Sequence, residues 1–108
     1  MAFELEELSL ELIESLVPLM PRIKQRDKSL EDQLRRAASS IGLNIAEAAG
    51  SDPGNKRARF FTAAGSARET QHALRQAIAW RHVRESEAER ALMLVRKLVA
   101  ILWRVTRG

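Results

Sequence analysis

Two kinds of side chain in this sequence could perform acid–base or metal chemistry: the glutamates Glu47 and Glu69 and the histidines His72 and His82. A carboxylate pair could transfer protons or bind a metal ion, but it needs converging ligands or a raised pKa inside a cleft. The sequence offers no second acid near either glutamate and no histidine on the helical face that carries Glu47. We therefore favour a structural role, in which each glutamate accepts hydrogen bonds or pairs with an arginine at a subunit seam.

The other chemical motifs are weaker. His72 and His82 are too far apart in sequence to share one helical face, and Ser39 and Ser40 have no base within helical reach. Residues 50–56 read Gly-Ser-Asp-Pro-Gly-Asn-Lys, whereas a phosphate loop needs Gly-x-x-x-x-Gly-Lys-Ser/Thr after a strand. The chain contains no cysteine, which excludes disulfides, thiolate zinc sites and cysteine nucleophiles. We predict no catalytic residue, no metal site and no cofactor, and hence no enzyme.

Length and composition indicate one globular domain. A chain of 108 residues is close to the size of a single domain, about 100–150 residues. Hydrophobic residues make up 45% and aromatic residues only 5%, so aliphatic side chains and alanine must build the core. The N-terminus is acidic, unlike a signal peptide, and the longest apolar run, residues 98–103, is far shorter than the ~20 residues of a membrane span. We expect a cytoplasmic protein without a membrane segment.

The net charge of +4 is the sum of two unequal parts. The first twenty residues contain five glutamates and no lysine or arginine, so this segment carries −5. The rest of the chain contains eighteen basic and nine acidic residues, and therefore carries +9. A basic body favours a polyanionic partner through long-range attraction, but a soluble helical protein rich in arginine has the same composition. Charge alone leaves both interpretations open.

Apolar residues recur at helical spacing along the whole chain and predict four helices, at about residues 4–25, 30–49, 56–81 and 87–106. Pro18 and Pro21 fall within the first of these, which predicts either a kink or a break into two shorter helices. Capping boxes at Ser29 and Ser86 are expected to begin the second and fourth helices. Residues 50–54 are expected to form a loop. The predicted fold is all-α: one antiparallel, up-down-up-down four-helix bundle over residues 1–108.

The first helix has more apolar surface than a single bundle needs. Leu5, Leu8 and Leu12 form the stripe that faces the core, and a second set lies on the opposite side. Contiguous exposed apolar surface usually marks an interface, so we predict a homo-oligomer. The interface residues that we expect are Phe3, Leu10, Ile13 and Val17 of the first helix, Leu43 and Glu47 of the second, and Phe61 of the third.

The second helix contains the string QLRRAASSIGLNIAEA at residues 33–48, and the third contains GSARET at residues 65–70. These strings resemble the four-helix bundle family that intervening sequences in bacterial 23S ribosomal RNA genes encode. That family usually continues Asn-Ile-Ala-Glu with glycine, whereas Ala48 and Ala49 come before Gly50 here. The residues that carry the resemblance are Asn44, Ile45, Ala46, Glu47, Ser66 and Glu69.

The resemblance implies a homopentameric ring of four-helix bundles. Relatives include the accessory protein of diversity-generating retroelements, which binds nucleic acid and a reverse transcriptase. The implied partners are therefore further copies of this chain, RNA or DNA, and a reverse transcriptase or another protein. The resemblance implies no established biochemical activity.

The predicted topology brings the loop after the first helix and the loop after the third helix to one end of the bundle. Arginines and lysines at this end could bind phosphates with little sequence readout. No aromatic residues alternate with them, so we expect no stacking platform for bases. Our leading hypothesis is nucleic-acid binding, and the alternative is an oligomeric scaffold or adaptor that docks another protein. The predicted nucleic-acid-binding residues are Arg22, Lys24, Arg26, Lys28, Arg81 and Arg84.

Overall fold

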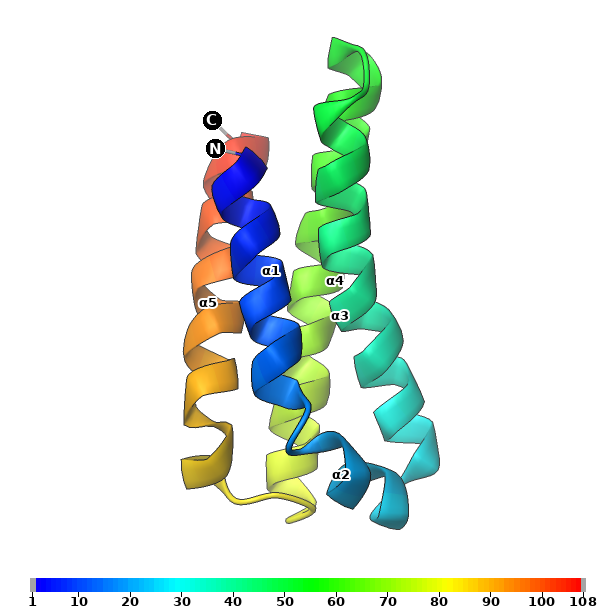
Figure 1. The fold of residues 1–108 in the computed structure, drawn as a ribbon, viewed down its shortest axis with the longest axis vertical. Helices are drawn as coiled ribbons and strands as arrows, with labels where there is room; N and C mark the ends of the chain where they lie inside the picture. The colour runs from blue at the N-terminus through cyan, green and yellow to red at the C-terminus, as the bar shows by residue number, and fades with distance from the viewer. Residues whose placement is uncertain (1, 108) are drawn as a thin grey trace.

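The structure, a computed structural model, describes residues 2–107, and within this range it contains helices and no strands. The helices are α1 (Ala2–Leu16), α2 (Met20–Arg26), α3 (Lys28–Ala49), α4 (Pro53–Ala79) and α5 (Glu85–Arg107). The four long helices lie side by side and successive ones run in opposite directions, while the short α2 lies where α1 ends and α3 begins (Figure 1). The all-α prediction is confirmed, with five helices in place of the four expected.

The predicted first helix, residues 4–25, is broken into two helices rather than kinked. Residues 17–19 form a turn between α1 and α2. Pro18 has no N–H and its ring clashes with the carbonyl four residues earlier, so α1 cannot continue through it. Pro21 lies in the first turn of α2, where a missing N–H costs nothing. The apolar stripe stays in phase across the break, since these members on both sides are buried: Leu5, Leu12, Leu16, Leu19 and Ile23.

An aspartate, not the expected serine, begins α3. The Asp27 Oδ1 atom accepts a hydrogen bond from the Leu30 N–H at 3.0 Å and satisfies one of the free donors of the first turn. The helix therefore begins at Lys28, and the prediction of a capping box at Ser29 is wrong. Since the cap lies two residues earlier, α2 and α3 are separated by Asp27 alone.

The same kind of cap begins α4. The Asp52 Oδ1 atom accepts a hydrogen bond from the Asn55 N–H at 3.0 Å. Pro53 follows the cap as the first helical residue, where its fixed φ suits a helix and its missing N–H is not needed. The expected loop at residues 50–54 is therefore shorter, because α4 already includes Pro53 and Gly54.

The loop between α4 and α5 also differs from the prediction at both ends. Arg81 has a φ of 65°, in the left-handed region, and ends α4 at Ala79. The N–H groups that follow donate back to the last turn, from Arg81 to the Ile78 carbonyl and from His82 to the Ala77 carbonyl, at 2.9 Å each. This is the Schellman pattern of hydrogen bonds. The loop that follows α4 lies at the lower end of the molecule in Figure 1.

Glu87 caps the start of α5. Its Oε1 atom accepts a hydrogen bond from the Arg84 N–H at 3.0 Å, so the helix begins at Glu85. The prediction that Ser86 is the cap is wrong by two residues. One half of a capping box is nevertheless present, because the Glu87 carboxylate binds the backbone N–H of the residue three positions before it.

Small residues on α4 let this helix approach α3 closely. Ala63, Ala67 and Ala77 have no exposed surface, and Ala73 and Leu74 are buried with them. Most of the long side chains of the core come from the other helices, which pack on the alanine face of α4 in the way that the sequence predicted. Fully buried members from those helices are Leu34, Ile41 and Ile45 of α3 and Val95, Leu98 and Leu102 of α5.

Two helix-interior glycines have opposite surroundings. A Cβ atom at Gly42 of α3 would lie 2.6 Å from the Ser9 Oγ atom of α1, whereas a Cβ at Gly65 of α4 would meet nothing within 4 Å. Ser9 is buried and donates a hydrogen bond to the Glu6 carbonyl at 2.7 Å. Gly42 therefore allows the close contact between α1 and α3, while Gly65 leaves open space.

Gly42→Ala and Gly65→Ala should consequently differ in stability, although both replace glycine by the better helix former. Gly65→Ala is expected to raise the free energy of unfolding by about 0.5–1 kcal/mol. Gly42→Ala gains the same propensity but must displace Ser9, and such overpacking costs about 1–3 kcal/mol. Urea unfolding of the two variants measures the difference directly. Equal stabilities would contradict the close contact at Gly42.

Candidate interaction surfaces

The predicted basic end lies where α2, the start of α3 and the α4–α5 loop meet. One of its six bases is already neutralised, because the Arg22 guanidinium binds both carboxylate oxygens of Glu87, at 3.0 and 2.5 Å. The hydrogen bond from Arg22, followed by the one from the Arg84 N–H, lowers the pKa of Glu87. The pair therefore stays ionised near neutral pH. The other five have no carboxylate partner among residues 2–107: Lys24, Arg26, Lys28, Arg81 and Arg84.

An exposed tryptophan lies next to these bases. Trp80 is the C-cap of α4, directly before Arg81, and it is 68% exposed. The sequence does not identify Trp80 as a residue of this surface, because the predicted third helix extends to residue 81. The left-handed Arg81 ends the helix earlier and leaves the indole ring at the surface of the basic end. A flat aromatic surface beside unpaired cations is suited to contact a nucleic-acid base.

The predicted oligomer interface includes a groove between α1 and α3. Leu10 and Leu43 lie on either side of it and are 54% and 64% exposed, although they are far apart in the sequence. Ile13 is only partly exposed and packs against the core, so it lies at the edge of the predicted outer face and not at its centre. The groove has a volume of about 430 Å³. Its lining is Glu6, Ser9, Leu10, Ile13, Ser39, Gly42, Leu43 and Ala46.

A second groove, between α4 and α5, was not anticipated. Phe61 of α4 and Trp103 of α5 line it and are 42% and 45% exposed. Guanidinium groups lie over both rings: Arg57 is 5.1 Å from the Phe61 centroid, and Arg68 and Arg107 are 5.1 and 4.1 Å from that of Trp103. Aromatic residues lie among basic residues in this groove because the antiparallel packing of α4 on α5 joins residues that are distant in sequence. We call this surface the α4/α5 groove.

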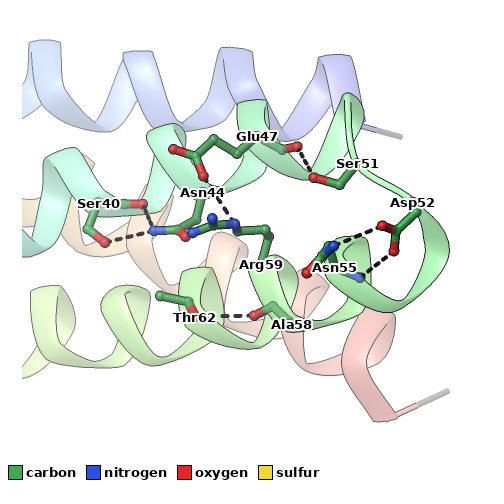
Figure 2. Close-up of polar contacts among 9 residues, drawn as sticks. All are labelled: Ser40, Asn44, Glu47, Ser51, Asp52, Asn55, Ala58, Arg59 and Thr62. Carbon is green, nitrogen blue, oxygen red and sulfur yellow. Dashed lines mark hydrogen bonds and ion pairs between the residues drawn. The ribbon is translucent and has the colours of Figure 1, made fainter.

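The string at residues 33–48 of α3 forms a polar connection between α3 and α4. The Asn44 side-chain amide donates to the Ser40 carbonyl and hydroxyl, at 2.9 and 3.0 Å, as Figure 2 shows. The Ser66 hydroxyl of α4 donates to the same Ser40 hydroxyl at 2.8 Å. Ile45 is completely buried beside them, whereas Ala46 is exposed. These contacts position two helices and offer no nucleophile, since the Ser40 hydroxyl has no base as a partner.

Comparison with known proteins identifies the family. The family model described as 23S rRNA-intervening sequence protein matches residues 3–104. The chain belongs to this family. A solved structure with the same fold is a protein of unknown function from the S23 ribosomal protein family of Bacteroides thetaiotaomicron VPI-5482. The superposition has a TM-score of 0.86 at 21% identity and covers 96% of this chain and 99% of that one. No curated protein matches the chain.

Glu47 and Glu69 belong to the two strings that carry the family resemblance. Their surroundings differ. Glu47 forms an ion pair with Arg59 of α4 at 3.0 Å, and the carboxylate and guanidinium lie between the two helices in Figure 2. Both side chains are about half exposed, so the pair contributes about 0–1 kcal/mol to stability. Glu47 therefore pairs with an arginine of its own chain, and its place at a subunit seam stays a prediction. Glu69 instead lines a polar groove between α3 and α4 with Arg36, His72 and Gln76.

The histidines of this family member are also separated. His72 is exposed beside Glu69, whereas the buried Nε2 atom of His82 lies 3.5 Å from the Asp27 carboxylate without a hydrogen bond. Within residues 2–107 no group of three histidine or acidic side chains converges as a metal site would require. In the same part of the chain, no helix is both long and apolar enough to cross a membrane.

Proposed function

We propose that this member of the 23S rRNA-intervening sequence family is a non-enzymatic homo-oligomer that binds the phosphates of RNA or DNA. The protomer acts as an antiparallel four-helix bundle in which α1 and α2 together take the place of one helix. The family resemblance suggests five copies in the assembly. Further copies of the chain would bury the outer face of α1 and the groove between α1 and α3.

The observation that carries nucleic-acid binding is the group of unpaired bases at one end. Lys24, Arg26, Lys28, Arg81 and Arg84 supply five cationic side chains without an internal carboxylate partner in residues 2–107. Asp27, between Arg26 and Lys28, and Glu85, next to Arg84, reduce this field only in part. Repetition around a ring would bring several such ends together and would attract a polyanion strongly at low salt.

A protein-docking scaffold is the second candidate function. The specific observation in its favour is that apolar side chains remain exposed away from the proposed seam, namely Trp80 at the basic end and Met93 on α5. A protein partner would bury these side chains, and its affinity would depend on apolar area more than on ionic strength. Salt dependence therefore separates the two candidates.

Retention of a generic single-stranded RNA on filters, across a salt series, tests the proposal. If all five bases bind phosphates, the logarithm of affinity should fall with the logarithm of salt at a slope of about −3.5, since each contact contributes about 0.7 on single strands. This slope makes binding about a hundredfold weaker at 200 mM than at 50 mM salt. No retention at low salt would contradict nucleic-acid binding and would favour the scaffold.

A further inference from the structure

Two surfaces of this chain match each other in charge and in the placement of apolar side chains. One is the outer face of α1 and the other is the α4/α5 groove. Since α1 and α4 each pack on both α3 and α5, the two surfaces lie on different sides of the bundle and both remain accessible. They cannot meet within one chain, but they can meet between two copies.

The outer face of α1 alternates apolar and acidic residues. Phe3, Glu7, Leu10 and Glu14 follow at spacings of four and three residues, which places them on one side of α1, and Val17 continues the same spacing in the turn that follows. All five are exposed. None of the glutamates of α1 forms an ion pair within residues 2–107. This face therefore offers apolar contacts together with unneutralised negative charge.

The α4/α5 groove has the opposite charge. Residues 53–68 and 96–107, which form the neighbouring halves of α4 and α5, contain eight basic residues and no acidic residue. Of these bases, only Arg59 has an ion-pair partner in the described part of the chain. Arg57, Arg68 and Arg107 surround the apolar lining, so the order of basic and apolar side chains here mirrors the acidic and apolar order of α1.

The geometry of the groove leaves room for a side chain from outside. Its volume is about 160 Å³, and a cavity of about 150 Å³ is known to hold benzene. Gly65 in its wall has open space around it. Arg68 and Arg107 lie over the same Trp103 ring, so their positive charges repel each other without a nearby acid to compensate. An apolar side chain from another molecule would fill the groove, and carboxylates on either side of it would compensate the charges of the two arginines.

We propose that copies of this chain associate head to tail, with the outer face of α1 of one copy seated in the α4/α5 groove of the next. This inference rests on the proposed self-association and names the two surfaces that meet. Leu10 would pack between Phe61 and Trp103, while Glu7 and Glu14 pair with the surrounding arginines. The lengths agree: residues 3–14 of α1 and residues 57–68 of α4 each span about 16 Å, at 1.5 Å per residue.

The charge of α1 also excludes the simplest alternative. A two-fold dimer centred on the outer face of α1 would place α1 against α1 and bring the glutamates of both copies together, and like charges facing each other are unfavourable. Head-to-tail contacts join two different surfaces, so each copy keeps one free α1 face or groove until the assembly closes. The expected product is therefore a ring, or an open filament, and not a dimer.

Charge exchange across the two surfaces tests this inference. Glu7→Arg with Glu14→Arg, or Arg68→Glu with Arg107→Glu, should each reduce the mass in light scattering to the 12.2 kDa of one chain. All four substitutions in one chain should restore the wild-type mass, because the complementary charges are exchanged and not lost. Glu85→Arg with Glu89→Arg is the control: it makes the same charge change at two exposed positions at the start of α5, outside both surfaces, and should leave the mass unchanged.

The outcomes separate this inference from the function on which it rests. A combined variant that stays dissociated, or a groove variant that keeps the wild-type mass, overturns the head-to-tail contact. A groove variant that keeps its mass but loses RNA retention overturns it too and assigns the groove to nucleic acid. Wild-type protein that is a single chain at every concentration contradicts self-association itself. Circular dichroism of each variant verifies that the helices remain folded.

Discussion

Leu10→Glu combined with Leu43→Glu is expected to convert the assembled protein into single chains of 12.2 kDa. Both leucines are more than half exposed and line the groove between α1 and α3, so the change leaves the core intact. Each leucine that is buried between copies contributes roughly 1.5–3 kcal/mol, and each copy loses two of them. The substituted carboxylates would in addition be desolvated without a partner. Light scattering coupled to size exclusion measures the mass.

The choice of residues follows from the structure. Ile13, which belongs to the same predicted interface, is partly buried against the core, so its substitution would confuse lost assembly with lost folding. Met93→Glu is the control, since Met93 is exposed to a similar degree on α5 and lies outside the proposed seam. If the double variant keeps the wild-type mass, the α1/α3 face is not the seam.

The second large effect is expected at the basic end. Replacing Lys24, Arg26 and Lys28 by glutamine should make the slope of log affinity against log salt less steep by about 2. Three phosphate contacts are lost, and each contributes about 0.7 to that slope on single strands. Affinity should fall for all sequences alike, since contacts to phosphates carry no sequence information. Filter binding of two unrelated RNAs over the salt series measures both the slope and its independence of sequence.

A control with the same loss of charge distinguishes a site from a general attraction. Lys56, Lys97 and Arg104 have no ion-pair partner in the described residues and lie away from the basic end. Their replacement by glutamine removes three charges as well and should change the slope much less. Equal losses from the two triple variants would mean that net charge, and not the end of the bundle, determines binding.

Local sequence signals were sufficient for most of the fold. Apolar periodicity identified the helices because a helix must place its buried residues every three to four positions, and this constraint is visible in one segment at a time. The predicted first residues of the helices were less accurate. Asp27 and Asp52 cap α3 and α4 because their carboxylates reach a free N–H three residues later, and the neighbouring serines satisfy the same local pattern without forming that bond. Choosing between such neighbours requires the packing of the adjacent helices.

The candidate surfaces were predicted unevenly for the same reason. The exposed face of α1 follows from the sequence alone, since Phe3 and Leu10 lie on one side of this helix and Val17 continues their spacing. The five unpaired bases also follow from composition and topology, but the loss of Arg22 to Glu87 does not, because the two residues lie on different helices. Trp80 became a surface feature only when Arg81 ended α4 in the left-handed conformation.

By itself, the sequence determined that this chain is a helical protein, a relative of the 23S rRNA-intervening sequence proteins, with an acidic first helix and a basic remainder. Those properties depend on residue type and on spacing within one helix. The tertiary structure alone decided which distant residues share a surface: Leu10 with Leu43, Glu47 with Arg59, and Phe61 with Trp103. The physical reason is that pairing across helices depends on their order, direction and closeness of approach, which is set by contacts such as Gly42 against Ser9 and not by any local pattern.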